Sequence, residues 1–147
     1  MNTTTTTWNT PRWFWVTATL GLLWNIFGVI QFLSTVGGTR ESLMRGGMTS
    51  PQAELYIQLP LWMTVSFAVG VFGGVMGSIL LLLRKRTAVP VFWGSLAAYS
   101  VLYAGDVTQG IFAAFGTPQV IILTTVVLIA MALLWLALRC RKLGGLR

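Results

Sequence analysis

Four long stretches of the chain are almost wholly apolar, and polar or glycine-rich segments separate them. The first stretch, from Trp13 to Val36, has no charged residue and is long enough to cross a hydrocarbon layer of roughly 30 Å. A cleavable signal peptide is the competing interpretation, but the run is too long for one and no A-x-A-like site follows it. The pattern therefore predicts four membrane-spanning helices, at about 12–36, 60–84, 88–115 and 118–139.

Glycine and proline mark the segments between these helices. Residues 37–48 are glycine-rich and polar, which predicts a loop. Ser50 followed by Pro51 predicts the start of a short amphipathic helix, and Pro60 should end it before the second span. Residues 116–118 read Gly-Thr-Pro, which predicts a tight turn. The last two spans should therefore form a hairpin.

The predicted domain organisation is simple. Residues 1–11 are polar and low in complexity, which predicts a disordered tail. Residues 12–140 then form a single four-span transmembrane domain, and residues 141–147 form a basic cytoplasmic tail.

Composition supports a membrane protein and argues against several other classes. The chain is 55% hydrophobic and 9% charged, with a mean hydropathy of +0.76, too apolar for a soluble core of this size. It has no histidine and one cysteine, so we expect no metal site, no cofactor and no enzyme activity. The net charge of +7 would suit a nucleic-acid partner, but the basic residues lie at the ends of apolar segments and not along a surface stripe.

The basic residues also predict the orientation in the membrane. A cytoplasmic N-terminus places eight lysines and arginines inside and only Arg40 and Arg45 outside. The positive-inside rule favours this arrangement, with both termini in the cytoplasm. Six of the inside residues close the second and last spans: Arg84, Lys85, Arg86, Arg139, Arg141 and Lys142.

Small residues repeat along the first two spans. Because helices in lipid associate through close backbone approach, such residues predict helix contacts. They serve either as a surface for dimerisation or sliding, or as ordinary packing inside one small bundle. We expect the faces of the two spans to meet. The second span supplies Gly70, Gly73, Gly74, Gly77 and Ser78, and the first supplies Gly21 and Gly28.

An acidic residue interrupts the third span. Asp106 shares one side of that helix with other polar residues, because the intervals between them are three or four residues. Asn25 and Gln31 of the first span could join them in an outward-opening polar pocket. The proposed pocket comprises Asn25, Gln31, Tyr99, Tyr103, Asp106 and Gln109.

Two interpretations of Asp106 remain open. A carboxylate inside a membrane is costly, and such residues often carry function, so Asp106 could titrate and couple a proton to solute movement. It could equally be a satisfied contact between helices or lie at a wet rim. Its candidate partners are Tyr99, Tyr103, Gln109 and an arginine of the first loop, Arg40 or Arg45. In every case we expect the side chain to face away from the acyl chains.

Three segments resemble small four-span inner-membrane proteins of bacteria, usually labelled hypothetical or, loosely, "sugar transporter". They read LLWNIFGVIQF, MTSPQAELYIQLPLW and FAVGVFGGVMGSILLLLRKRTAVPVF, and the resemblance covers about residues 12–115. It implies a multi-pass protein of the bacterial inner membrane and carries no mechanism. The group often has an acidic residue where this chain has Gln31. The known small sugar carriers contain three-helix repeats, and this sequence shows no such repeat.

These observations predict a non-catalytic membrane protein that acts by helix packing, as an accessory, assembly or interaction subunit. Its partners would be the lipid bilayer and either a second copy of itself or a larger membrane complex. The alternative is a small-solute or proton-coupled transporter that uses the polar side of the third span. A membrane enzyme is disfavoured because no histidine is present to act as a base.

Overall fold

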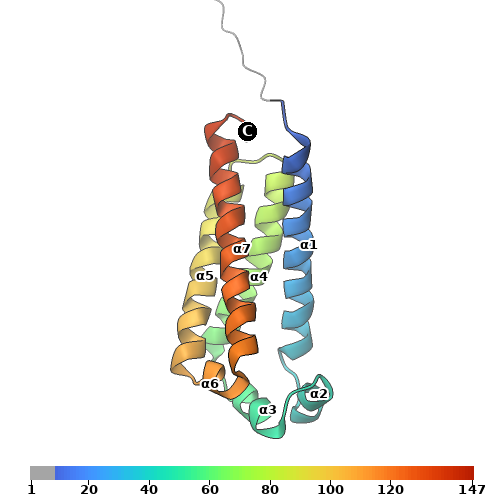
Figure 1. The fold of residues 1–147 in the computed structure, drawn as a ribbon, viewed down its shortest axis with the longest axis vertical. Coiled ribbons are helices and arrows are strands. Elements are labelled where there is room, and N and C mark those ends of the chain that lie inside the picture. The colour runs from blue at the N-terminus through green and yellow to red at the C-terminus, as the bar shows by residue number, and fades with distance from the viewer. Residues whose placement is uncertain (1–8) are drawn as a thin grey trace, which may run out of the picture.

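The computed structural model describes residues 9–147, and within that range the chain forms seven helices and no strand. The predicted all-α fold with four long apolar helices is confirmed. These helices form an elongated bundle (Figure 1). Residues 1–8, part of the tail predicted at 1–11, lie outside the described residues. The four long helices are α1 (Arg12–Thr35), α4 (Leu61–Leu82), α5 (Ala88–Thr108) and α7 (Thr117–Lys142).

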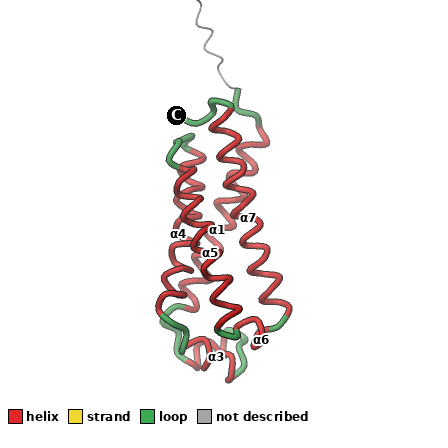
Figure 2. Tube along the Cα trace, turned by 90° about the vertical axis from the view of Figure 1, so that its left-hand side faces the viewer, coloured by secondary structure: helices red, strands yellow, loops and turns green. Residues whose placement is uncertain are grey.

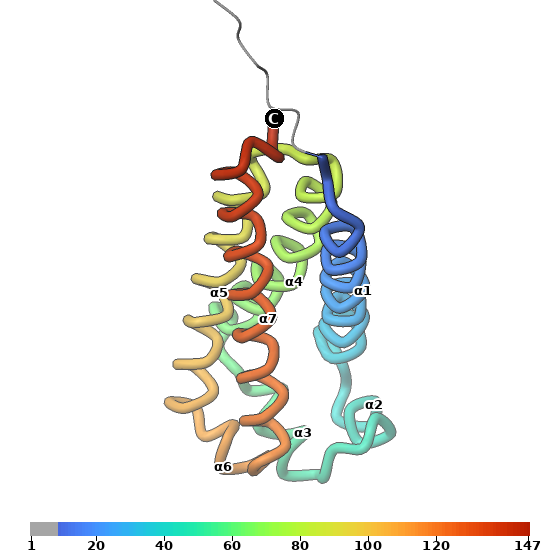
Figure 3. The backbone as a smooth tube through the Cα atoms, turned by 45° about the horizontal axis from the view of Figure 1, so that its top comes forward, coloured from blue at the N-terminus to red at the C-terminus, as the bar shows by residue number. Residues whose placement is uncertain are grey.

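The long helices are arranged in the order α1, α4, α5, α7, and the bundle is loosely closed between α7 and α1. Helix α4 packs extensively on both α1 and α5, and α5 packs on α7, whereas α1 and α7 contact each other only weakly. Figure 3 shows α1 on one side of α4, with α5 and α7 on the other. This weak edge becomes important for the site below.

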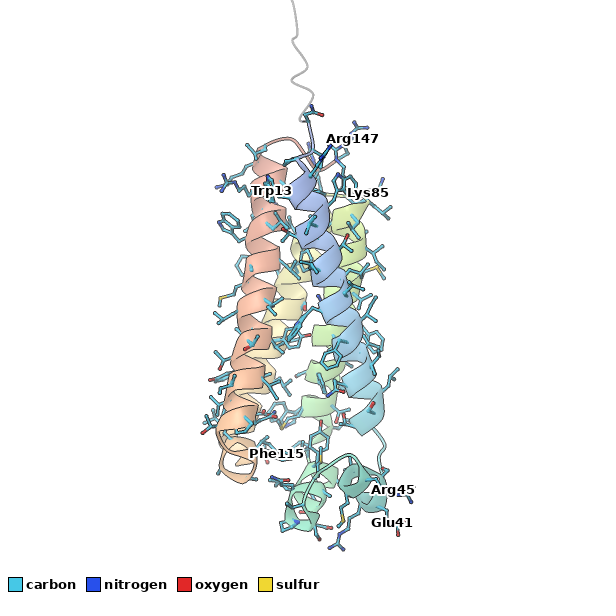
Figure 4. All side chains as sticks on the ribbon, turned by 45° about the vertical axis from the view of Figure 1, so that its right-hand side comes forward. Trp13, Glu41, Arg45, Lys85, Phe115 and Arg147 are labelled. Carbon is cyan, nitrogen blue, oxygen red and sulfur yellow. The ribbon has the colours of Figure 1, made fainter. Side chains whose placement is uncertain are left out.

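The two ends of the bundle differ in chemistry (Figure 4). Trp13, Lys85 and Arg147 lie at one end, and Glu41, Arg45 and Phe115 lie at the other. We call these the terminal end and the capped end. The basic residues at 84–86 and in the last turn of α7 belong to the terminal end. Three short helices cover the capped end: α2 (Arg40–Arg45), α3 (Ser50–Ile57) and α6 (Ile111–Phe115).

The segment predicted as a loop at 37–48 contains helix α2, so that prediction was wrong. Thr39 begins the helix, and its hydroxyl accepts a hydrogen bond from the Ser42 backbone N–H at 3.3 Å. Glu41 lies in the first turn, where a negative charge is favourable, and Arg45 lies in the last. The glycines end the helix, since Gly47 has φ of 102°. Helix α3 does begin at Ser50 with a proline in its first turn, as predicted.

The third span is shorter than predicted. Helix α5 ends at Thr108, and Gly110 adopts a left-handed conformation with φ of 74° before α6 begins. A residue with a side chain rarely adopts this conformation, so glycine fixes the break at this point. The predicted turn after Phe115 is present, with Gly116 at φ of 71°. Loops are confined to the ends of the bundle (Figure 2).

The C-terminal residues, predicted as a basic cytoplasmic tail at 141–147, fold back onto the turn between α4 and α5. Helix α7 continues to Lys142, and the Arg147 N–H donates to the Arg84 carbonyl at 2.6 Å. The Arg86 N–H donates back to the Arg147 carbonyl at 3.0 Å. Leu146 is only 1% exposed and joins the core. Apolar burial of Leu146 and these backbone hydrogen bonds together hold this basic segment against the bundle.

An apolar core fills the terminal half of the bundle. All four long helices contribute to it, and each member is almost fully buried. Helices α1 and α7 meet here, because a Cβ on Gly21 would lie 2.5 Å from a methyl carbon of Leu133. This half is therefore solidly packed. The core includes Phe14, Ala18, Leu81, Phe92, Leu134 and Ala137.

Candidate functional site

The glycines of α4 make their contacts inside the chain. A Cβ on Gly70 would lie 2.6 Å from the Tyr99 ring, and one on Gly77 would lie 2.8 Å from the Phe92 ring. Gly73 faces Ser95 in the same way at 3.2 Å. The Ser95 hydroxyl donates to the Gly70 carbonyl at 2.7 Å. Most of the small residues of α4 thus face α5, and not α1 as predicted.

One glycine of α4 does face α1. A Cβ on Gly74 would lie 1.8 Å from Oδ1 of Asn25, so the amide side chain occupies the space that the glycine leaves. Asn25 is buried, and its Nδ2 donates to the Gly21 carbonyl at 2.8 Å within α1. Gly28 lies against Val71, and the buried Ser78 hydroxyl donates to the Gly74 carbonyl. Asn25 is therefore a packing residue between α1 and α4.

The capped half of the bundle contains a large cavity of about 750 Å³. All four long helices line it, and so do the segments 36–38, 56–57 and 111–115 of the capped end. Apolar and aromatic side chains form most of its surface, including Trp24, Phe67 and Tyr99. A volume of several hundred Å³ with few polar groups is typical of small-molecule sites.

The cavity opens between α1 and α7, the edge where the long helices contact each other least. Phe27 and Gln31 on α1, and Ile121 and Ile122 on α7, line the cavity and are also exposed on the outside. Three of these four side chains are apolar, so the opening faces the surface that the hydrocarbon layer covers.

Asp106 lies in the wall of this cavity and is only 4% exposed. One carboxylate oxygen, Oδ2, accepts a hydrogen bond from Nε2 of Gln119 at 3.0 Å. None of the expected partners bonds to it. Arg40 donates to the Ser50 hydroxyl, and Arg45 lies 3.9 Å from Glu41. The side chain faces protein and the cavity, as the sequence led us to expect.

The remaining residues of the predicted pocket divide into two groups. Tyr99 and Gln31 line the cavity together with Asp106. Tyr103 does not line the cavity. Its hydroxyl instead lies 3.3 Å from the Thr124 hydroxyl, where α5 contacts α7. Gln109 is exposed at the end of α5, and Asn25 lies between α1 and α4. The predicted polar side therefore does not enter the cavity at Gln109, which is the exposed C-cap of α5.

Five polar residues of the cavity were missed by the sequence analysis: Gln119, Tyr56, Thr35, Thr64 and Thr125. Tyr56 lies in α3 at the capped end. Burial raises the pKa of its hydroxyl above the usual 10.0, a side-chain hydrogen bond with Thr35 opposes the increase, and the charge of Asp106 adds to it. The Pro118-Gln119 pair at a helix start was the only sequence signal for Gln119, since its position relative to Asp106 depends on the turn through α6.

Helices α3 and α6 close the capped end of the cavity. Gln52 of α3 donates through Nε2 to the Ala114 carbonyl of α6 at 3.0 Å. The rings of Tyr56 and Phe115 lie 6.4 Å apart, edge to face. These contacts hold Tyr56 over the same polar corner that Asp106 and Gln119 form. The polar corner, as we call it from here on, comprises Asp106, Gln119, Tyr56 and Thr35.

The described part of the chain holds no group of three His, Cys, Asp or Glu side chains that could bind a metal ion. No protein-family model, curated protein or solved structure matches this chain. Fold and site together define a small multi-pass membrane protein with four helices that can span a bilayer and a cavity that all four of them line.

Proposed function

We propose that this protein is a non-catalytic membrane subunit that binds a small amphipathic molecule in the cavity between α1 and α7. The cavity carries the proposal: it is large, mostly apolar, and polar at one corner. Such a site suits a molecule with an apolar body and a single polar group. Its lateral opening allows entry from the hydrocarbon layer.

The packed terminal half favours binding over transport. A carrier needs a path to both sides of the membrane, and the core around Phe14, Leu81 and Phe92 closes one side. The alternative function, a small-solute or proton-coupled transporter, would need that core to open. An accessory role that depends on the glycine face of α4 is also less favoured, because those glycines already contact other helices of the same chain.

We also propose the bacterial inner membrane as its location, with both termini in the cytoplasm. The location follows from the resemblance of residues 12–115, and the orientation from the positive-inside rule. The capped end, and with it the cavity, then lies in the outer half of the membrane.

Binding can be tested with diphenylhexatriene, an apolar fluorophore that accepts energy from tryptophan. Trp24 lines the cavity, so bound probe should quench tryptophan emission in a saturable way. The test uses a double variant, Thr64→Phe with Val126→Phe, in which two lining side chains fill part of the cavity. We expect its affinity for the probe to fall by about tenfold or more, the equivalent of about 1.4 kcal/mol.

A matched control is available on the same two helices. Val65 and Leu128 are 52% and 55% exposed and do not line the cavity. The double variant Val65→Phe with Leu128→Phe should bind the probe as the unmodified chain does. Equal binding by the filled, control and unmodified proteins would mean that the probe sits in detergent or on the outer surface, which contradicts the proposal.

A further inference from the structure

Asp106 brings a negative charge into an otherwise apolar cavity without a matching cation. In residues 9–147 its carboxylate has one hydrogen bond, from the neutral amide of Gln119. Arg45 pairs with Glu41 instead, and both side chains are more than 80% exposed at the surface of the capped end. The charge of Asp106 is therefore compensated by neutral groups alone.

A carboxylate can accept about four hydrogen bonds, and this one accepts a single bond from the protein. Its other oxygen, Oδ1, has capacity for a ligand, and the residue itself lines the cavity. A buried charge is stabilised most by a direct opposite charge that also donates hydrogen bonds. An ammonium group meets both conditions, whereas an anion would be repelled.

Aromatic rings surround the same space. Tyr56, Tyr99, Phe67 and Trp24 all line the cavity. The face of an aromatic ring attracts a cation, and the attraction is strongest where water is excluded. The aromatic walls therefore favour the same ligand charge as Asp106 does, and they also contact an apolar body of the ligand.

We propose that the cavity selects amphipathic organic cations: the ammonium group of the ligand pairs with Asp106 in the polar corner, and its apolar body lies between α1 and α7. This inference rests on the proposed function, because it names the class of molecule that the cavity binds. The same ammonium chemistry occurs in free lipophilic amines and in aminophospholipid headgroups.

Two probes that differ by one charge test the selection. Trimethylammonium-diphenylhexatriene carries a quaternary ammonium, and diphenylhexatriene is its neutral parent. Because the quaternary ammonium has no N–H donor, the pair tests the contribution of charge and of the aromatic walls alone. We expect the cationic probe to bind the unmodified protein at least tenfold more tightly than the neutral one. In the Asp106→Asn variant, which keeps the shape of the side chain, the cationic probe should lose about that factor while binding of the neutral probe stays unchanged.

The control removes a carboxylate from the same end of the bundle. The side chain of Glu41 is 85% exposed, so Glu41→Gln changes the net charge as Asp106→Asn does without altering the cavity. It should leave the binding of both probes unchanged. Retained binding of the neutral probe by Asp106→Asn shows that this variant is folded.

The outcomes separate this inference from the proposed function. Failure of both probes to bind would overturn the proposed function itself. Equal affinity for the two probes, or no effect of Asp106→Asn, would overturn the cation selection and leave a neutral binding cavity. Competition in phosphatidylethanolamine nanodiscs, compared with phosphatidylglycerol nanodiscs, would assign the ammonium to a lipid headgroup. Absence of this competition would assign the ammonium to a free amine. Both results support pairing of an ammonium group with Asp106.

Discussion

Replacement of Gly74 by alanine tests the closest contact between α1 and α4. The new Cβ would lie 1.8 Å from Oδ1 and 2.6 Å from Cγ of Asn25, far closer than two such atoms can approach. Asn25 must then leave its position and lose the 2.8 Å hydrogen bond to the Gly21 carbonyl, or α1 must move away from α4.

The expected size of the effect follows from three contributions. Overpacking of a well-packed contact costs about 1 to 3 kcal/mol. Loss of a hydrogen bond between groups in a membrane helix costs about 0.6 to 1.7 kcal/mol. Alanine favours the helix over glycine by about 1 kcal/mol. Since the last two nearly offset each other, we expect Gly74→Ala to lower the free energy of unfolding by about 1 to 3 kcal/mol.

The assay is unfolding in mixed micelles with a rising fraction of SDS, followed by the helical circular dichroism signal. Gly94→Ala is the matched control, because Gly94 is an exposed helical glycine of α5 and a Cβ there would meet nothing within 4 Å. That substitution should be neutral or stabilise by up to about 1 kcal/mol.

A double variant identifies the cause of the effect. Asn25→Ala removes the amide with which the new methyl group would clash, so Gly74→Ala should be tolerated in that background. The two substitutions should therefore show a coupling free energy of about 1 to 3 kcal/mol. If Gly74→Ala behaves like Gly94→Ala, or if the two effects simply add, the argument for close approach at this position is wrong.

Three further predictions concern the ends of the bundle. Because the charge of Asp106 contributes to the raised pKa of Tyr56, Asp106→Asn should lower that pKa, measured as the tyrosinate absorbance that Tyr56→Phe removes. Because the pKa of Tyr56 is higher in the folded chain than in the unfolded chain, its protonated hydroxyl stabilises the fold below pH 10. This stabilisation is lost as the pH rises through the folded pKa, so Tyr56→Phe should reduce alkaline destabilisation. Leu146→Ala should cost roughly 2 to 5 kcal/mol because Leu146 is buried in the core.

Each of these has a result that would contradict it. An unchanged pKa of Tyr56 in the Asp106→Asn variant would mean that the carboxylate and the hydroxyl are not neighbours. For the C-terminal segment, Leu143 is 50% exposed and provides the comparison. Equal effects of Leu146→Ala and Leu143→Ala would show that the segment does not dock on the bundle.

Much of the architecture was predictable from the sequence. Length and hydropathy define the four long helices, because each must present apolar side chains over about 20 residues to cross the membrane. Pro51 and Gly116 identified the start of α3 and the last turn correctly, since proline restricts φ to values that suit a first helical turn and glycine readily adopts the positive φ of the turn. The sequence also indicated that Asp106 faces away from lipid, because a charge there is too costly.

Contacts across the bundle depended on the tertiary structure. Periodicity places Gly70, Gly73 and Gly77 on a helix surface but does not identify the partner, and the rotation of α4 turns them toward α5. The polar stripe of the third span does not reach the cavity along its full length, because α5 ends at Thr108 and its C-cap Gln109 is exposed, whereas Asp106 is buried. The pairing of Asp106 with Gln119 joins residues from two helices through the α6 turn.

The sequence by itself determined that the chain crosses a membrane and approximately where, because hydrophobicity and helix length are local properties. The tertiary structure alone decided that the terminal half is packed and the capped half hollow. That difference arises from how α1 and α7 meet at Gly21 and Leu133 and fail to close on each other beyond that point. The separation of α1 from α7 depends on segments that are far apart in the chain, so no local pattern of residues encodes it.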